Sequence, residues 1–304
     1  MREWEFIDWI RSQTQLDRAA VPVGPGDDAA VVACGGEKVI VTTDQVLDGV
    51  HFKLAEHGPE AGGRKAMARN LSDVAAVAGK PLGAVVTVAF SKGFPREGAE
   101  AIYRGLRSVG DEFRCPIVGG DVGSWSGPLA ISVTVLARPG GIEPVLRCEA
   151  RAGDAVCVTG ALGGAWKSRR HLTFTPRINE ARTLASRCRL NAMIDVSDGL
   201  AADLWQICRA SGVGADLEIA AIPIHPDLKG ESPAAGLKAA LGDGEDYELL
   251  FTLPPEEAER LIHDQPLGVR VSRIGAIVAD KALTLLHPDA RREPIEPAGW
   301  EHQI

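Results

Sequence analysis

Segments with strand and helix patterns follow one another in an irregular order along this 304-residue chain. Two strand-like runs, 27–34 and 38–44, are neighbours, and the helical pattern 63–80 comes only after them. Two further strand-like runs, 115–121 and 128–137, are again consecutive. A doubly wound parallel sheet needs strands and helices that alternate. The order therefore predicts an α+β fold.

The chain length and one polar segment indicate two domains. A chain of 304 residues is too long for one ordinary core and suits two of average size. The segment 137–154 is rich in glycine, proline and charge, which is typical of a crossing between domains. We therefore expect an N-terminal domain over residues 1–140 and a C-terminal domain over residues 141–304.

Charge and hydropathy exclude several classes of partner. The formal net charge is −8, from 41 acidic and 33 basic residues, which disfavours a nucleic-acid-binding surface. No run approaches the roughly 20 apolar residues of a membrane span. Residues 1–15 alternate charged and apolar side chains on a helical period, which predicts an amphipathic helix and not a signal peptide. The expectation is a cytoplasmic protein that binds neither nucleic acid nor membrane.

Aspartates recur at the expected ends of strands and starts of helices, several of them beside glycine. They are Asp27, Asp28, Asp44, Asp73, Asp121, Asp195 and Asp198. Mg²⁺ takes a few carboxylates and completes its coordination with water and substrate phosphates, so dispersed carboxylates without histidine or cysteine suit it. The pattern indicates a magnesium-dependent site for a phosphate-bearing substrate.

Taken singly, most of these aspartates also have an ordinary structural explanation, as turn residues, helix caps or solvated charges. Ser197 and Asp198 precede an expected helix and are suited to cap it. Asp73 is three residues from Asn70 on one face of the 63–80 helix, and a solvated face is the alternative reading. Asp44, however, ends an apolar strand, where a capping role does not apply. The aspartates are hard to explain as caps when they are taken together.

Six segments resemble, in order and spacing, the motifs of the bacterial thiamine-monophosphate kinase family. They are GPGDDAAVV (24–32), TTDQVLDGVHF (42–52), KAMARNLSDVAAVAGKP (65–81), IVGGDVG (117–123), MIDVSDGLAADL (193–204) and GDGEDYELLF (242–251). The wider superfamily includes aminoimidazole ribonucleotide synthetase, selenophosphate synthetase and the hydrogenase-maturation dehydratase. The resemblance covers most of the chain.

The resemblance implies a fold and a set of ligands. The N-terminal domain would pair with its twin in a homodimer, and the C-terminal domain would fold over it with ATP between them. Several Mg²⁺ ions would be held by Asp28, Thr42, Thr43, Asp44, Asp73, Asp121, Asp195 and Asp198. ATP would contact Tyr103, Gly120, Asp121, Arg147 and Ser197. Thiamine phosphate would contact His51, Glu245 and Trp300.

The three acceptor residues also have plain alternatives. His51 would otherwise be an exposed residue of an edge strand, Glu245 a loop charge, and Trp300 a ring tucked against the last strand. Trp300 offers a face on which a cationic thiazolium or a pyrimidine can stack. Only the resemblance joins these distant segments.

The implied reaction is transfer of the γ-phosphoryl group of ATP to the phosphate of thiamine phosphate. The attacking oxygen is already ionised, so the reaction needs positioning and charge neutralisation and no catalytic side chain that acts as a base. One alternative is a sister ATP-dependent enzyme of the superfamily with another acceptor. A non-catalytic nucleotide-binding regulator is the other.

The segment 160–190 departs from the family pattern, because the long helical stretch expected there is shortened. Four basic residues, Lys167, Arg169, Arg170 and His171, gather in it. The alternatives are a solvated face and a contact to phosphate.

Overall fold

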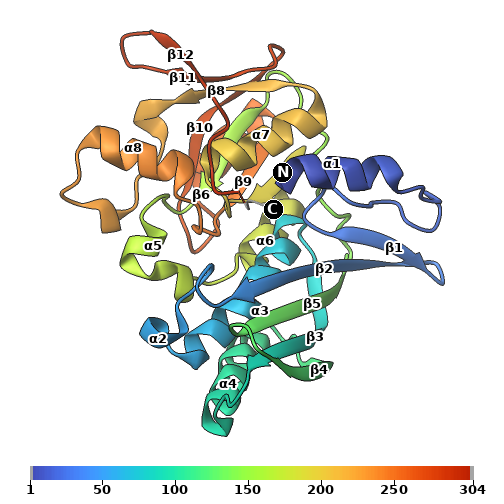
Figure 1. Ribbon diagram of the computed structural model, residues 1–304. Coiled ribbons are helices and arrows are strands. Elements are labelled where there is room, and N and C mark those ends of the chain that lie inside the picture. The colour runs from blue at the N-terminus through green and yellow to red at the C-terminus, as the bar shows by residue number, and fades with distance from the viewer. Residues whose placement is uncertain (1–2, 302–304) are drawn as a thin grey trace.

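The computed structural model describes residues 3–301 and contains two β-sheets with helices packed on them. Figure 1 shows the sheet of the first half below and the sheet of the second half above. The elements of the first half are α1 (Glu3–Gln13), β1 (Ala30–Cys34), β2 (Glu37–Leu47), α2 (Leu54–His57), α3 (Pro59–Ala76), β3 (Lys80–Ser91), α4 (Arg96–Glu112), β4 (Ile117–Trp125) and β5 (Ala130–Arg138).

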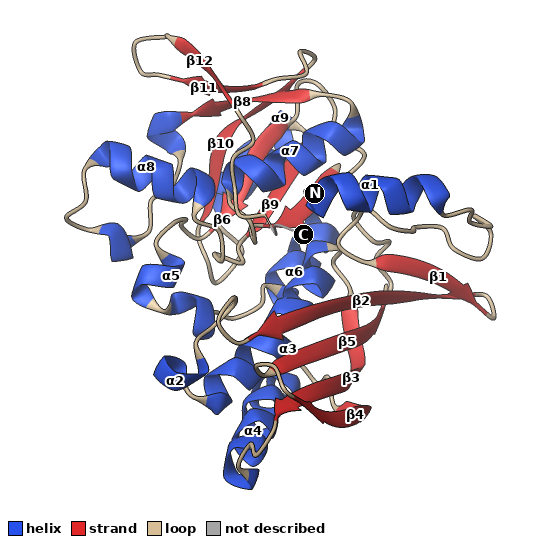
Figure 2. Cartoon of the chain, viewed as in Figure 1, coloured by secondary structure: helices blue, strands red, loops and turns tan. Residues whose placement is uncertain are grey.

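The second half contains a larger sheet and shorter helices. Its elements are β6 (Ala155–Thr159), α5 (Ala165–Ser168), η1 (Arg170–Leu172), α6 (Ile178–Arg187), β7 (Ala192–Asp195), α7 (Leu200–Ser211), β8 (Gly214–Glu218), α8 (Pro233–Gly242), β9 (Leu249–Leu253), α9 (Pro255–Asp264), β10 (Val271–Val278), β11 (Leu283–Leu286) and β12 (Arg292–Ile295). Figure 2 shows helices and strands mixed along both halves, and the expected α+β class is confirmed.

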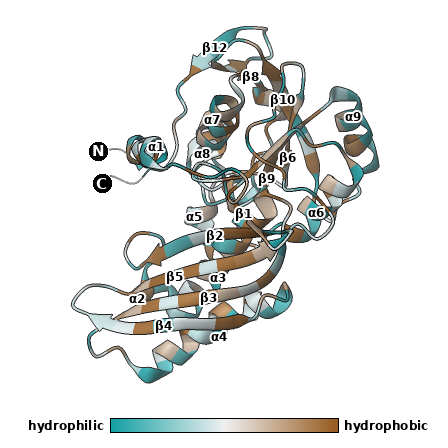
Figure 3. Ribbon diagram, turned by 90° about the vertical axis from the view of Figure 1, so that its right-hand side faces the viewer, coloured by the Kyte–Doolittle hydropathy of each residue, from teal (hydrophilic) through white to brown (hydrophobic). Residues whose placement is uncertain are grey.

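The first sheet has the strand order β1-β2-β5-β3-β4, and β3 and β4 are its parallel pair. One face packs on α3 through alternate residues of the strands, such as Ile40 on β2 and Ile131 and Val133 on β5. The other face stays open in the single chain, where Val85 on β3 and Val118 on β4 are 38% and 64% exposed. Figure 3 shows brown, apolar residues along β2, β5, β3 and β4, and these include the core residues that face α3. An open sheet face that carries exposed apolar side chains suits an interface.

The second sheet has the order β12-β11-β8-β10-β6-β9-β7, and its central strands are buried on both faces. On β6, Ala155 and Cys157 join the core that contains α3, whereas Val156 and Val158 join a second core under α7. This alternation explains why the strand sequence is apolar at every position. One core therefore runs continuously from the first sheet to the second.

Helix α3 lies between the two sheets and is the centre of the molecule. It begins with Pro59 at its first turn, where a missing N–H costs nothing. Most of its residues are buried, and they include the polar residues Lys65, Asn70 and Ser72. Buried polar side chains need partners. The partners of these residues build the candidate site.

The expected elements agree with the structure over most of the chain. The amphipathic N-terminal helix is confirmed as α1, and the shortened segment 160–190 contains α5, η1 and α6. The ends of the described chain meet, because the backbone N–H of Trp4 donates to Glu301 Oε1 at 3.4 Å. Within residues 3–301, no helix combines the length and the apolar character that a bilayer span requires.

Candidate active site

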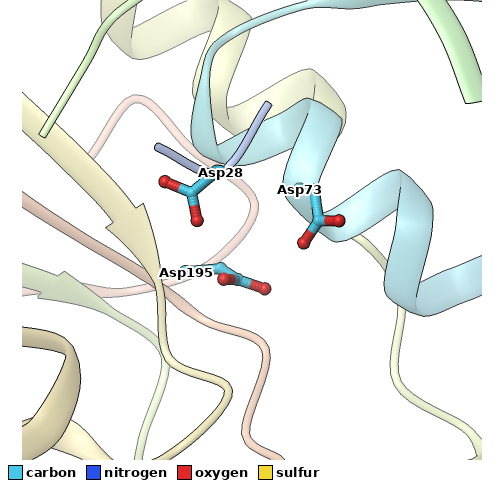
Figure 4. Close-up of side chains that lie close together, drawn as sticks. All are labelled: Asp28, Asp73 and Asp195. Atoms are coloured by element: carbon cyan, nitrogen blue, oxygen red, sulfur yellow. The ribbon is translucent and has the colours of Figure 1, made fainter. Parts of the chain in front are cut away.

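Three aspartates from distant segments form a cluster of carboxylates. Asp28 precedes β1, Asp73 lies on α3, and Asp195 ends β7. One ligand oxygen from each lies within 4.8 Å of the others. Figure 4 shows the three carboxylates directed toward a common space. The solvated-face explanation of Asp73 is therefore wrong.

Neighbouring side chains fix the orientation of each carboxylate. Thr42 Oγ1 donates to Asp73 Oδ2 at 2.5 Å, and Ser72 Oγ donates to Asp195 Oδ2 at 2.5 Å. Arg147 donates to both oxygens of Asp28, at 2.9 and 2.6 Å. Such bidentate pairs have defined geometry. The cluster is thus held in place by its own surroundings.

Burial shifts the proton equilibria of this cluster. Burial, followed by repulsion from Asp28, raises the pKa of Asp195 to about 7. Burial, followed by repulsion from Asp44 and Asp195, raises the pKa of Asp73 well above its ordinary value. Adjacent carboxylates repel each other and disfavour ionisation. Oxygen donors under this repulsion fit Mg²⁺, since a hard cation relieves it.

The cluster opens into a pocket of about 580 Å³. We name it the acidic pocket. It is lined by Glu3, Ile7, Asp27, Asp28, Thr42, Thr43, Asp44, Gln45, His51, Arg69, Asp73, Ser132, Arg147, Asp195, Ser197, Asp198, Tyr247 and Trp300. The pocket therefore contains most of the residues that the sequence analysis singled out.

Two neighbouring threonines of β2 contribute differently. Thr42 faces α3 and reaches Asp73. Thr43 borders the pocket, but its side chain lies on the opposite face of the sheet, where Oγ1 donates to the Val133 carbonyl at 3.1 Å and lies 2.9 Å from Thr134 Oγ1. The Thr43 hydroxyl therefore does not point into the cluster.

Backbone hydrogen bonds join three distant segments on one side of the pocket. The Glu245 N–H donates to the Ser197 carbonyl at 2.8 Å, and the Trp300 N–H donates to the Asp198 carbonyl at 3.0 Å. Ser197 and Asp198 do not cap α7, because its cap residue is Gly199 and no side-chain cap bond is present there. The turn is instead fixed by Asp203 Oδ2, which accepts the N–H groups of Asp198 and Gly199.

Lys65 organises the far end of the pocket. Its fully buried ammonium group lies 2.5 Å from Glu245 Oε2 and donates to the His51 carbonyl at 2.5 Å. His51 is itself buried, and its ring lies 5.8 Å from that of Trp300, which is 43% exposed. The exposed-strand alternative for His51 and the loop-charge alternative for Glu245 are therefore wrong. The ring of Trp300 is also not tucked away.

The loop before β9 is strained and firmly anchored. Glu245 and Tyr247 have left-handed backbones, with φ of 62° and 52°, which costs about 1–2 kcal/mol per residue. The residues that follow them, Asp246 and Glu248, are anchored by arginines. Asp246 pairs with Arg170 at 3.0 Å, and Glu248 pairs with Arg177 at 2.8 and 2.5 Å. The anchors therefore hold Glu245 and Tyr247 toward the site.

The basic group in segment 160–190 divides into two kinds. Lys167 and Arg169 are exposed, as a solvated face predicts. Arg170 is largely buried in its pair with Asp246, and His171 is fully buried against Trp166, with ring centroids 4.3 Å apart. Burial lowers the pKa of His171 to about 3. The four residues do not line the acidic pocket, so a phosphate contact there is not supported.

Comparison with known proteins agrees with this geometry. Sequence models of the AIR synthase related protein N-terminal and C-terminal domains match residues 26–138 and 151–287. The thiamine-monophosphate kinase of Rhodopirellula baltica is 38% identical, over 99% of this chain and 97% of its own length. That of Bacillus subtilis is 32% identical over 99% of both chains.

This chain belongs to the thiamine-monophosphate kinase family. The solved structure of AaThiL complexed with AMPPCP and TMP superimposes with a TM-score of 0.83 at 29% identity, and the alignment covers 99% of this chain and 97% of that chain. The family resemblance seen in the six motifs is thereby confirmed.

Three residues that the family resemblance assigns to ATP lie apart from the acidic pocket. Tyr103, Gly120 and Asp121 line a separate, mainly apolar groove of about 570 Å³ beside β3, β4 and α4. Asp121 is in register with Thr87 on β3, which in turn is in register with Ser132 on β5. Three strand spacings separate β4 from β2, or roughly 14 Å. Within one chain, Asp121 therefore does not join Asp28, Asp73 and Asp195.

Several residues that shape the site of this thiamine-monophosphate kinase family member were not predicted to do so from the sequence. Lys65 and Arg69 precede Asp73 by eight and four residues on α3, so helical spacing was a usable signal for both. Asp203 carried no such signal, since its role depends on the fold of the turn before α7. The anchors Arg170 and Arg177 became evident only when the structure placed them against the loop before β9.

Proposed function

We propose that this chain transfers the γ-phosphoryl group of ATP to the phosphate of thiamine phosphate, with thiamine diphosphate and ADP as products. The observation that carries the proposal is the acidic pocket itself, which joins the carboxylate cluster to His51 and Trp300 in one space. The names of the relatives and the AMPPCP and TMP of the AaThiL structure point the same way.

We further propose that Mg²⁺ ions are held by Asp28, Asp73 and Asp195, with Asp44, Asp198 and Thr42 around them. Bound Mg²⁺ would neutralise the carboxylates and the phosphate oxygens. The ions would also have to release Asp28 from its pair with Arg147, whose planar fork suits a nucleotide phosphate. Thr43 would contribute through its backbone, since its hydroxyl lies on the other face.

The residues of the chain contribute position and electrostatics to this reaction. A phosphate oxygen of the acceptor is already ionised, so the chain needs no group that removes a proton from it. His51, Glu245 and Trp300 would hold the thiamine part, with Trp300 stacked on a ring of the substrate. The carboxylate cluster at the other end would hold the nucleotide phosphates for an in-line approach.

Residues 1–140 would bind nucleotide and metal and form the dimer, and residues 141–304 would complete the substrate site. The open face of the first sheet, with Val85 and Val118 exposed, supports a homodimer. In such a dimer, Tyr103, Gly120 and Asp121 of one chain would contact the ATP bound at the carboxylate cluster of the partner, because within one chain they lie far from the cluster. An equal mixture of Asp73→Asn and Asp121→Asn chains should then regain activity in about a quarter of its sites. About half of the dimers contain one chain of each kind, and in such a dimer one site has both substitutions while the other site has neither.

The decisive experiment uses purified protein with ATP, Mg²⁺ and thiamine phosphate. Formation of thiamine diphosphate and ADP in equal amounts is expected, and EDTA should abolish it. A protein that binds ATP and Mg²⁺ and leaves thiamine phosphate unchanged would contradict the proposal. The chain would then be better assigned as a related ATP-dependent enzyme that acts on another phosphate-bearing acceptor.

A further inference from the structure

Helix α3 presents a row of three charged residues, Lys65, Arg69 and Asp73, to the site. Four residues along a helix advance about 6 Å and return to nearly the same face. Lys65 holds Glu245 at the acceptor end, and Asp73 belongs to the carboxylate cluster. Arg69 therefore lies between the two ends, where donor and acceptor must meet.

The guanidinium group of Arg69 is incompletely paired. Its Nε lies 3.1 Å from Asp44 Oδ2 without hydrogen-bond geometry, and Nη1 makes no hydrogen bond to any residue between positions 3 and 301. Both atoms are buried, and the side chain is 15% exposed. A buried donor without an acceptor is costly. Its presence in a pocket indicates that a ligand supplies the acceptor.

Other cations near the pocket already have partners. Arg69 and Arg147 are the arginines among its described lining residues, which include no lysine. Arg147 uses its fork on both oxygens of Asp28. Lys65, behind the pocket wall, is fully buried and paired with Glu245. In the proposed function Arg147 serves the nucleotide phosphate once metal takes Asp28, so Arg69 is the arginine of the lining that remains for a second anion at the centre of the pocket.

We propose that Arg69 binds the phosphate group of the acceptor, a phosphate monoester, and holds it between the carboxylate cluster and the thiamine end. This assignment rests on the proposed function. A guanidinium suits the role because it is always charged and presents paired donors to phosphate oxygens. The nearby Asp44 keeps the side chain in place before the acceptor arrives.

The test compares two ligands that differ only in the phosphate, thiamine phosphate and thiamine. Calorimetry measures their dissociation constants with Mg²⁺ and a non-hydrolysable ATP analogue, for wild type and for Arg69→Gln. The variant should lose about 10–100-fold in affinity for thiamine phosphate, as a lost charge-assisted contact predicts. Its affinity for thiamine should change less than about 2-fold, since thiamine has no phosphate to lose. Arg69→Lys should recover part of the difference.

Arg64→Gln is the matched control, because Arg64 lies on the same helix and donates to the carbonyls of Leu172 and Phe174 outside the pocket. It should lower the melting temperature and leave the preference for thiamine phosphate over thiamine unchanged. If the Arg69→Gln defect disappears at high Mg²⁺, Arg69 serves only to neutralise Asp44, and the assignment is wrong. It is equally wrong if wild type phosphorylates thiamine phosphate but Arg69→Gln keeps the full preference. A wild type that does not turn over thiamine phosphate would instead overturn the proposed function.

Discussion

The ammonium group of Lys65 on α3 lies 2.5 Å from Glu245 Oε2 in the loop before β9, and this pair joins the two halves of the molecule beside the acidic pocket. Lys65 is fully buried, and the Glu245 side chain is 18% exposed. Burial lowers the pKa of Lys65 to about 8, while Glu245 opposes that shift. A buried charge of this kind destabilises the fold when its oppositely charged partner is removed.

Lys65→Met should therefore destabilise the protein by about 3–5 kcal/mol, because it leaves Glu245 and the His51 carbonyl without their cation. Urea denaturation followed by circular dichroism measures the change. Lys38→Met is the control, since Lys38 and Glu143 form an exposed pair that contributes less than about 1 kcal/mol. Equal losses for both variants would mean that Lys65 is not an interior anchor.

Asp73→Asn should abolish turnover and leave the fold intact, because it removes one of three clustered carboxylates. In the wild type, Mg²⁺ with a nucleotide analogue should raise the melting temperature, as binding to the native state alone requires. The variant should show little of this shift. Asp111→Asn, at an exposed pair with Arg107, is the control and should behave as wild type. A near-normal rate for Asp73→Asn would contradict the metal site.

Without metal, stability should fall as pH rises from about 4 to about 7. The folded pKa of Asp195, about 7, lies above its ordinary value of 3.8, so the folded state holds more protons than the unfolded state in this range. The unfavourable ionisation of Asp195 is half complete at about pH 7 and nearly complete about one pH unit higher. Mg²⁺ with nucleotide should flatten or reverse this fall of stability with pH, because Mg²⁺ binds the ionised carboxylates. Melting temperatures at pH 5, 6, 7 and 8 with EDTA or Mg²⁺ measure this, and identical slopes would refute it.

Trp300→Ala should raise the Michaelis constant for thiamine phosphate about tenfold, because a desolvated stacking contact contributes roughly 1–2 kcal/mol. The Michaelis constant for ATP should barely change. Initial rates at varied concentrations of each substrate give both values. Trp125→Ala, at an exposed ring on β4 away from the acidic pocket, is the comparison variant. An equal loss for both substrates would make Trp300 a structural residue.

Arg177→Gln should loosen the strained loop before β9, because Glu248 loses its bidentate partner. We expect a loss of about 3–5 kcal/mol in stability together with weaker binding of thiamine phosphate, since Glu245 and Tyr247 depend on this anchor. Calorimetric binding of thiamine phosphate and of nucleotide separates the two effects. Lys167→Gln, at an exposed pair with Glu231 in the same segment, should change neither. Unaltered thiamine phosphate binding in Arg177→Gln would show that the anchor serves stability alone.

The residues that could carry the chemistry were predictable from the amino-acid sequence. Alternating apolar residues predicted strands such as β2, and helical spacing predicted α3, because these patterns reflect contacts between near neighbours. The six motifs identified the family and gave the candidates Asp28, Asp73 and Asp195. The sequence also located the segment 160–190 as a departure from the family pattern.

The grouping of those candidates depends on how the chain packs in three dimensions. Asp28, Asp73 and Asp195 meet because α3 packs between two sheets, and this packing depends on contacts between distant segments. The same packing keeps Asp121 across the first sheet from them and turns the Thr43 hydroxyl to the opposite face. Arg69 and Lys65 became site residues only when burial removed their access to water and left their charges to be paired within the fold.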